Sequence, residues 1–431
     1  MKRGFYTVMG AQFFSSLADN ALLIASIALL IELKGPAWMT PLLKFFFTVS
    51  YVVLAAFVGA FADALPKGRV MFFTNTIKIV GCCLLFFTQE ITPAGIPEHL
   101  TVLLAYAVVG LGAAAYSPAK YGILTEMLPP QQLVVANGWI EGLTVASIIL
   151  GTMMGGMLIS PKIAAMLLSI DFPFIDTGVN TPHEAALLII AVMYLLAAAV
   201  NLHIPDTGAR YPKQQTNPLI LIRDFAGCLT VLWRDKLGQI SLAVTTLFWG
   251  AGATLQFIVL KWAESHLHLP LDRGAILQGV VAVGIAIGAI LAGRFVPLRR
   301  SLSVLPLGII MGFFVCILIF VTWMPLVYFL LVLIGAVAGF FVVPMNALLQ
   351  HRGHVLLSAG HSIAVQNFNE NLNILFMLAL YALMIKYNFH INTIIILFGL
   401  SVSTTMWLIM KRHASNQKQG DSMHLIGIEK H

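Results

Sequence analysis

The chain is a succession of apolar runs of the length that crosses a lipid bilayer. Each run spans about 18–25 residues, and a hydrocarbon core of about 30 Å is crossed by a helix of about 20 apolar residues. Of the 431 residues, 59% are hydrophobic and 10% are charged, whereas soluble domains have about 25% charged residues. Lipid offers the backbone no hydrogen-bond partner, so segments of this kind must be helical. The sequence therefore predicts an all-α integral membrane protein.

The pattern predicts twelve transmembrane helices. The first six are expected near 7–32, 42–64, 70–89, 100–125, 131–159 and 184–204, and the other six near 237–263, 274–297, 303–323, 325–350, 358–386 and 391–410. The expected domains are an N-terminal six-helix bundle (1–204), a cytoplasmic linker (205–236), a C-terminal six-helix bundle (237–412) and a cytoplasmic tail (413–431).

The linker contains a helix signal. Asn217 and Pro218 are suited to the N-cap and first-turn positions, and alternating apolar and charged residues follow. We expect an amphipathic helix at the cytoplasmic membrane interface; a loosely ordered linker is the alternative.

The basic residues indicate the orientation. Of the 25 lysines and arginines, 17 fall on the face shared by the two termini and six on the other, and the remaining two, Lys78 and Lys120, fall within predicted spans. Cytoplasmic loops are enriched in these residues, so both termini are expected in the cytoplasm. The net charge of +7 is explained by this orientation, and no nucleic-acid partner is expected. The four cysteines show no metal-binding spacing, and neither a metal nor another cofactor is expected.

Four of the charged residues inside the predicted spans are candidate site residues: Asp19, Lys120, Glu141 and Glu370. An isolated charge at a helix centre costs about 2.5–3.5 kcal/mol on insertion scales, so such residues face a bundle interior or a water-filled cavity. Both signs are present, which suits a substrate that carries both charges. This pattern is typical of a transporter with a polar central site.

The two halves resemble each other. The segment 110–124 in the fourth span aligns with 335–349 in the tenth, and the polar residues Asn137 and Glu141 of the fifth span correspond to the polar stretch 366–371 of the eleventh. Two six-helix repeats with a site at their interface are the architecture that this implies.

The segment 59–69 resembles the signature of the major facilitator superfamily. It contains Asp63, Lys67, Gly68 and Arg69 between the second and third spans. Asp63 with Arg69 is predicted to latch the cytoplasmic ends when the protein closes on that side. A solvated loop is the alternative, and for Lys67 alone it is the favoured interpretation.

A narrower resemblance covers almost the whole chain. The blocks that carry it are 18–22 (ADNAL), 115–124 (AYSPAKYGIL), 136–141 (ANGWIE), 247–252 (LFWGAG), 340–350 (FFVVPMNALLQ) and 364–371 (AVQNFNEN). In this order they are similar to the bacterial lysophospholipid transporter family. The chain departs from that family at Gln256, where the family has an arginine.

The resemblance implies a flippase that moves lysophosphatidylethanolamine and related lysolipids across the bacterial inner membrane to the cytoplasmic leaflet. There an acyltransferase–acyl carrier protein synthetase would restore the missing chain. Other membrane lipids surround the protein, and a monomer is expected.

The charged residues inside the predicted spans suit a phosphoethanolamine head group, which carries one anionic phosphate and one ammonium. Lys120 is predicted to bind the phosphate, and Asp19 or Glu141 the ammonium, through charge-assisted hydrogen bonds. Asn20, Asn137, Gln256 and Asn346 are candidate neutral partners, and Tyr116 is a candidate lining residue. Alternatives remain for the charges: Asp19 paired with Lys120, Glu141 protonated, and Glu370 in a network with neighbouring asparagines.

The acyl chain is predicted to enter sideways from the bilayer, because exposing it to water would cost about 0.8 kcal/mol per CH₂. Two apolar seams are candidates for this entry: Phe45, Phe46, Phe47 and Val49 on one, and Ile148, Ile149, Ile287 and Ile290 on the other.

Two other functions remain open. The first is a proton-coupled transporter of a small metabolite or drug, with Asp19 and Glu141 as proton carriers. The second, an integral-membrane lipid enzyme, is disfavoured because no acyltransferase or zinc-protease motif is present.

Overall fold

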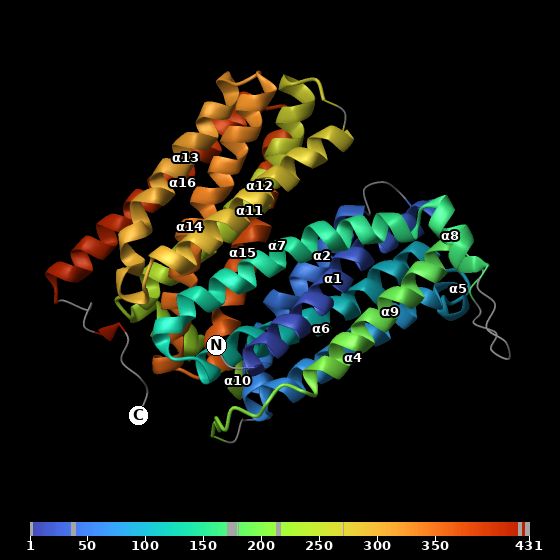
Figure 1. Ribbon diagram of the computed structural model, residues 1–431, viewed down its shortest axis with the longest axis horizontal. Coiled ribbons are helices and arrows are strands. Elements are labelled where there is room, and N and C mark those ends of the chain that lie inside the picture. Colours follow the sequence, from blue (N-terminus) through green and yellow to red (C-terminus); the bar gives the residue numbers. More distant parts are fainter. Residues whose placement is uncertain are drawn as a thin grey trace. The chain divides into compact units, whose positions relative to one another are not determined.

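The computed structural model describes residues 3–35, 40–169, 179, 181–212, 217–269, 271–420 and 425–426, and in these ranges it contains helices and no strands (Figure 1). The helices of the first half are α1 (Arg3–Glu32), α2 (Thr40–Val53), α3 (Ala55–Ala64), α4 (Lys67–Phe86), α5 (Thr88–Ile91), α6 (Glu98–Met127), η2 (Pro130–Gln132), α7 (Leu133–Leu158), α8 (Pro161–Leu168) and α9 (Pro182–Asn201). Those of the second half are α10 (Pro218–Arg234), α11 (Gly238–His266), α12 (Leu271–Phe295), η3 (Leu298–Val304), α13 (Leu305–Ile317), η4 (Leu318–Phe320), α14 (Met324–Leu356), α15 (Ala359–Lys386) and α16 (Ile391–Lys418).

The number of candidate spans agrees with the sequence. Among the described residues, 11 helices are long and apolar enough to cross a membrane, and the number reaches the predicted twelve when the pair α2 and α3, which bends by 67° at its break, is counted as one span. The sequence predicted this pair as one span over 42–64. The described chain is thus an all-α membrane protein with the predicted arrangement of spans.

Two compact units divide the chain. One consists of residues 1–123 and 146–216, and the other of residues 124–145 and 217–431. The boundary falls inside α6 and α7, so the segment that contains Asn137 and Glu141 belongs to the second unit. The expected six-helix domains, with their break at 205–236, stay a prediction.

In the first unit, α9 packs against both α1 and α4 (Figure 1). Its beginning is defined by local chemistry: Thr181 and Glu184 form a reciprocal capping box, and Pro182 occupies the first turn. Close packing of α7 on α1 depends on two small residues, because a Cβ on Gly151 or Gly155 would lie within 2.6–2.8 Å of an α1 carbonyl oxygen. These contacts hold α1, α4 and α9 together around a buried polar cluster.

In the second unit, the most extensive contact is between α12 and α14. Two pairs of glycines four residues apart face each other here, Gly284 and Gly288 on α12 with Gly335 and Gly339 on α14. A Cβ at any of the four would collide with the facing backbone. Small residues at this spacing let membrane helices approach closely enough for extensive van der Waals contact.

The linker and the tail are more ordered than a polar break suggests. Asn217 caps α10 by accepting a hydrogen bond from the backbone N–H of Leu219, as its sequence predicted. α16 continues to Lys418, into the region expected to be the tail, and the boundary at 413 stays a prediction. Two hydrogen bonds hold this extension: Arg412 Nε donates to Gln239 Oε1, and Asn416 Nδ2 donates to the Lys236 carbonyl.

Candidate functional site

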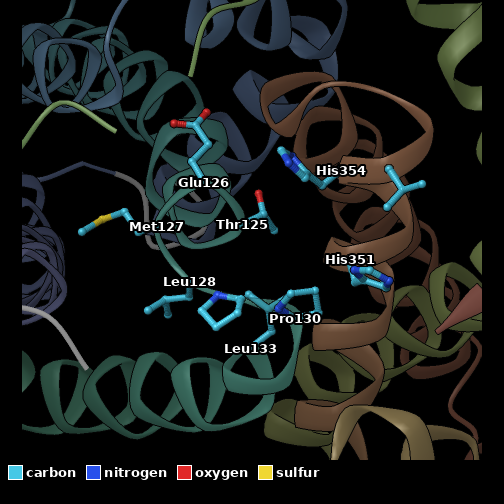
Figure 2. A pocket seen from close by; sticks show the side chains of 10 residues that line it. Thr125, Glu126, Met127, Leu128, Pro130, Leu133, His351 and His354 are labelled. Carbon is cyan, nitrogen blue, oxygen red and sulfur yellow. The ribbon is translucent and has the colours of Figure 1, made fainter. Parts of the chain in front are cut away.

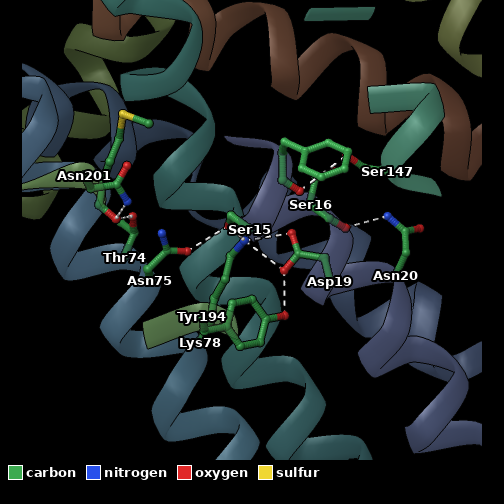
Figure 3. Close-up of polar contacts among 12 residues, drawn as sticks. Ser15, Ser16, Asp19, Asn20, Thr74, Asn75, Lys78, Ser147, Tyr194 and Asn201 are labelled. Carbon is green, nitrogen blue, oxygen red and sulfur yellow. Dashed lines mark hydrogen bonds and ion pairs between the residues drawn. The ribbon is translucent and has the colours of Figure 1, made fainter. Parts of the chain in front are cut away.

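A buried ion pair lies at the centre of the first unit. Lys78 Nζ, on α4, donates to both oxygens of Asp19 on α1, at 2.7 and 2.9 Å. The Tyr194 hydroxyl, on α9, donates to the same carboxylate at 2.7 Å. Three helices therefore meet at one carboxylate (Figure 3).

A second layer of polar groups satisfies the lysine. Lys78 Nζ donates to Ser15 Oγ at 3.0 Å, and Ser15 in turn donates to Asn75 Oδ1 at 2.8 Å. The rings of Tyr116 and Tyr194 lie 5.1 and 5.6 Å from the ammonium, within the range of cation–π attraction. The ammonium thus lies among two aromatic rings and a serine hydroxyl in addition to the Asp19 carboxylate.

The pair is asymmetric in its exposure. The side chain of Lys78 is 1% exposed and that of Asp19 is 22% exposed. The carboxylate is therefore the part of the pair that a ligand can reach, and the ammonium lies behind it. The buried Tyr116 hydroxyl has no hydrogen-bond partner, so this cluster includes a polar group that a ligand or a water can satisfy.

This geometry corrects the alternative in which Asp19 pairs with Lys120. Lys78 is the cation that binds Asp19, although its position in the sequence predicted only that it lies within a span. The missed signal was a requirement for charge balance, since a carboxylate inside a span needs a cation on a neighbouring helix. Lys120 is half-buried in α6, and its Nζ lies 4.2 Å from the centre of the Tyr121 ring.

Asn20, a further predicted site residue of this unit, bonds to its own helix. Its Nδ2 donates to the Ser16 carbonyl at 2.8 Å, and its side chain is half-buried. The structure thus brings Asp19 and Tyr116 around Lys78, whereas Asn20 makes its described hydrogen bond one turn away along α1.

A second polar cluster lies in the other unit, between α14 and α15. Gln366 Nε2 donates to Glu370 Oε1 at 2.7 Å and to Asn346 Oδ1 at 3.2 Å. All three residues are buried, and Gln366 Oε1 has no hydrogen-bond partner. The network expected around Glu370 is therefore present, but its donor is Gln366. Asn369 and Asn371 instead donate to carbonyls of their own helix.

Asn137 is part of a buried amide pair. Its Nδ2 donates to Gln350 Oε1, and Gln350 Nε2 donates back to Asn137 Oδ1, both at 2.9 Å. The pair joins α7 to α14 and satisfies both amides. A side chain bound reciprocally in this way has little capacity left for a substrate, so the contact indicates a structural role.

Gln256 and Glu141 complete the predicted site residues. Gln256 is exposed on α11, and it donates to Gln278 of α12 at 3.0 Å. Its backbone carbonyl accepts a second hydrogen bond from Gln278. Glu141 lies in α7, and its side chain is outside the described part of the structure.

The predicted gate has a different partner from the one expected. Asp63, at the end of α3, forms an ion pair of 2.6 Å with Lys67, at the start of α4, and both side chains are buried. Lys67 also donates to the Ala62 carbonyl and lies 4.9 Å from the Tyr211 ring. The solvated loop favoured for Lys67 was therefore wrong.

Arg69, predicted to pair with Asp63, is exposed. Hydrogen bonds from Arg210 and from the Gly208 backbone lower the pKa of the nearby Asp206 to about 2, and the charge of Arg69 contributes to this shift. Arg69 therefore belongs to the exposed charged group beside the α3–α4 turn. A latch to other helices stays a prediction.

A bidentate ion pair holds the end of α10. Arg352 of α14 donates to both oxygens of Asp235 at 2.7 and 3.1 Å. Burial alone would raise the pKa of Asp235, but the hydrogen bonds from Arg352 and from the backbone N–H groups of Gly238 and Leu237 lower it below its usual value. Arg352 appeared in the sequence only as one of many cytoplasmic basic residues, and its burial could not be read from charge counts.

A polar cavity of about 350 Å³ lies within the second unit (Figure 2). Its walls are the end of α6, the turn before α7 and the last turns of α14. Thr125, Glu126, His351 and His354 supply its polar side chains. Among the described residues, no group of three or more histidine, cysteine or acidic side chains is placed to hold a metal ion.

Comparison with known proteins gives the family. Residues 8–375 match the model of the Major Facilitator Superfamily. The chain is 41% identical over 388 residues to the lysophospholipid transporter LplT of Yersinia pestis (strain Pestoides F), which covers 90% of this chain and 88% of the relative. The LplT protein of Yersinia pseudotuberculosis serotype I (strain IP32953) matches to the same extent.

Solved structures confirm the fold. A bacterial homologue of the iron transporter ferroportin in its outward-facing state superposes with a TM-score of 0.69 over 97% of this chain and 100% of the other, at 14% identity. The transporter FucP in the outward conformation gives a TM-score of 0.69 over 95% and 98% of the two chains, at 12% identity. The chain is a membrane transporter that belongs to the lysophospholipid transporter family of the major facilitator superfamily.

Proposed function

We propose that the chain moves lysophospholipids, lysophosphatidylethanolamine among them, to the cytoplasmic leaflet of the bacterial inner membrane by alternating access. The observation that supports the substrate class is the 41% identity to LplT over nine-tenths of the chain. Reacylation by an acyltransferase–acyl carrier protein synthetase would follow, and both termini would lie in the cytoplasm.

The asymmetric ion pair of the first unit suits an ammonium. Asp19 keeps part of its carboxylate exposed while Lys78 and Tyr194 hold it in place. An ethanolamine ammonium can donate to the exposed side of this carboxylate as a charge-assisted hydrogen bond. Asp19 and Lys78 together are neutral, and so is a phosphoethanolamine head group, so their combination leaves no net charge to be buried.

The phosphate would be bound by Lys120, whose ammonium is half-buried on α6. The partnerless hydroxyl of Tyr116, one turn earlier on the same helix, would donate to a phosphate or glycerol oxygen. In the second unit, Glu370 with Gln366 supplies a further acidic group and a free amide oxygen. These two are candidate partners for the ammonium at another stage of the cycle.

The acyl chain would remain in apolar surroundings throughout. Phe45, Ile148, Ile287 and Ile290 expose their side chains at the protein surface, where lipid chains would contact them. The hydrophobic penalty of about 0.8 kcal/mol per CH₂ favours a tail that stays on this apolar side while the head group crosses the polar cluster. Sideways entry from the bilayer is the route that this requires.

Leaflet-specific uptake of labelled lysophosphatidylethanolamine into spheroplasts that lack their own carrier tests the proposal. Cells that express the chain should internalise the lipid, and cells that express Asp19→Ala to the same membrane level should not. The competing function predicts no lysolipid uptake and a small-molecule flux that stops when the proton gradient is collapsed. That result would overturn the proposal.

A further inference from the structure

The helix α10 combines basic and apolar side chains on the surface that it turns away from the second unit. Its protein-facing side is fixed by three contacts: the Phe225 ring lies 5.5 Å from the ring of Phe368, the Trp233 indole N–H donates to Asn369 Oδ1 at 3.3 Å, and Asp235 binds Arg352. Phe225 and Leu232 are buried by this packing. The side of α10 opposite Phe225 therefore faces away from the second unit.

The exposed side of α10 carries two arginines with apolar side chains on either side of them, since Ile220 and Val231 are also exposed and lie about 120–140° from Phe225 in the opposite sense from Leu219. At 3.6 residues per turn, Arg223 and Arg234 lie within about 20° of each other and about 160–180° from Phe225. Leu219, Ile222 and Trp233 lie together on one flank, about 60–120° from Phe225. Leu219 is 77% exposed, and Ile222, Trp233 and both arginines are also exposed.

The acidic residue of this helix does not neutralise the arginines. Asp224 lies on the other flank, about 100° from Phe225 in the opposite sense from the Leu219–Trp233 flank. Asp235, which follows the helix, is already bound to Arg352. Two cations next to an apolar flank that includes a tryptophan form the arrangement that recognises the interface of an anionic bilayer, where the apolar side chains insert and the guanidinium groups meet phosphates.

From this geometry we infer that α10 is a docking surface for anionic phospholipid head groups, with Arg223 and Arg234 binding the phosphates and the exposed side chains of Leu219 and Ile222 inserting beside them. The inference does not depend on which molecule the protein transports. The three contacts attach α10 directly to α14 and α15. Binding of anionic lipid to α10 would therefore make the behaviour of the second unit depend on the lipid composition of the membrane.

A fluorescence experiment on the full chain in vesicles tests this. The four native cysteines, Cys82, Cys83, Cys228 and Cys316, are replaced by alanine, and Leu219→Cys is labelled with an environment-sensitive dye. Quenching by a lipid that carries a nitroxide near its head group is measured in phosphatidylcholine vesicles with increasing phosphatidylglycerol. We expect quenching to increase with the anionic lipid and to weaken with added salt, because exposed charges are screened.

In the variant Arg223→Gln/Arg234→Gln, the affinity of α10 for the anionic surface should fall about 25-fold, so that quenching is weaker at every phosphatidylglycerol fraction, since each basic residue near an anionic surface contributes about a fivefold gain in affinity. The matched control is Arg299→Gln/Arg300→Gln, which removes the same charge from two exposed residues of η3. The control should behave as the parent protein.

Three outcomes would overturn the inference. Equal quenching in the presence and absence of phosphatidylglycerol would show that α10 does not distinguish head groups. An equal shift in the control variant would show a general charge effect. Quenching absent in vesicles of every composition would mean that another part of a protein covers this face. Thermal unfolding of each variant in detergent shows that the comparison is between folded proteins.

Discussion

The Lys78 ammonium is almost completely buried, whereas the Asp19 carboxylate that it binds at 2.7 Å keeps 22% of its side-chain surface exposed. An ion pair that served stability alone would have no reason to leave one member accessible. Lys78 holds the Asp19 carboxylate in place, and in the proposed function Asp19 presents its charge to the substrate. The two residues are therefore expected to respond differently to substitution.

Replacing Lys78 should destabilise the first unit. Lys78→Met leaves the Asp19 carboxylate without its cation, and the loss of one partner from a buried pair costs about 3–5 kcal/mol. The melting temperature in detergent should fall clearly for this variant. The double variant Asp19→Asn/Lys78→Met removes both charges and should recover most of the lost stability, yet it should not transport lysolipid. Recovery of transport in the double variant would reduce the pair to a structural role.

Replacing Lys120 should affect transport without affecting folding. Its ammonium is half-buried and lies against Tyr121, so Lys120→Ala should keep the melting temperature within a few degrees. If Lys120 binds the phosphate, uptake of labelled lysolipid should fall at least tenfold, the amount that corresponds to one lost charge-assisted hydrogen bond of about 1.5–3 kcal/mol. Wild-type uptake by Lys120→Ala would contradict the phosphate role.

The Asp63–Lys67 pair should control the rate of the conformational cycle. Asp63→Ala leaves Lys67 buried without its carboxylate and should shift the population of conformers. We expect slower transport, with the affinity for the head group unchanged within a few-fold. Spin-label distances across the cytoplasmic ends measure the shift. Lost binding with an unchanged distance distribution would contradict the gate.

Tyr211 offers a matched pair of variants at the same gate. Its ring lies 4.9 Å from Lys67 Nζ, and a cation–π contact depends on the ring and not on the hydroxyl. Tyr211→Phe should therefore transport as the parent protein does, and Tyr211→Leu should be slower. Equal rates in the two variants would show that the ring does not act on Lys67.

The Asp235–Arg352 pair should persist over the physiological pH range. Because the hydrogen bonds lower the pKa of Asp235 in the folded protein, the stability from this group is present above its unfolded pKa of about 3.9 and is lost as pH falls through the lower folded value. A double-mutant cycle of Asp235→Asn and Arg352→Gln should give a coupling of about 1–3 kcal/mol. The coupling should be the same at pH 5 and pH 8, and a steep change between them would contradict the assignment.

The glycines of α12 can be compared within one helix. A Cβ on Gly288 would collide with the carbonyl of Ala336, whereas a Cβ on Gly279 would meet nothing within 4 Å. Gly288→Ala should destabilise the protein by about 1–3 kcal/mol through overpacking, and Gly279→Ala should fold normally. Folded yield after extraction and the melting temperature measure the difference. Equal stability of the two variants would show that α12 and α14 can separate without cost.

The sequence by itself determined the class of fold, the positions of the spans and the family. Apolar length alone specifies where helices cross, because lipid satisfies no backbone group and each crossing needs a fixed number of residues. Local signals were equally direct: Asn217 before Pro218 predicted the start of α10, and the structure shows that cap. The blocks in the sequence predicted the family, which 41% identity over 90% of the chain confirms.

The partners of the buried charges were decided only by the tertiary structure. Asp19 could be recognised from its place in an apolar run, but the choice between Lys78 and Lys120 depends on how α4 and α6 are rotated and positioned around α1. The same holds for Lys67, Arg352 and Gln366, which the sequence presented as ordinary loop or helix residues and the structure buries with partners. Membrane helices are alike in their hydropathy, so the periodicity of the sequence does not specify which helix faces meet. Close backbone contacts, such as those at Gly284 and Gly339, determine which faces meet.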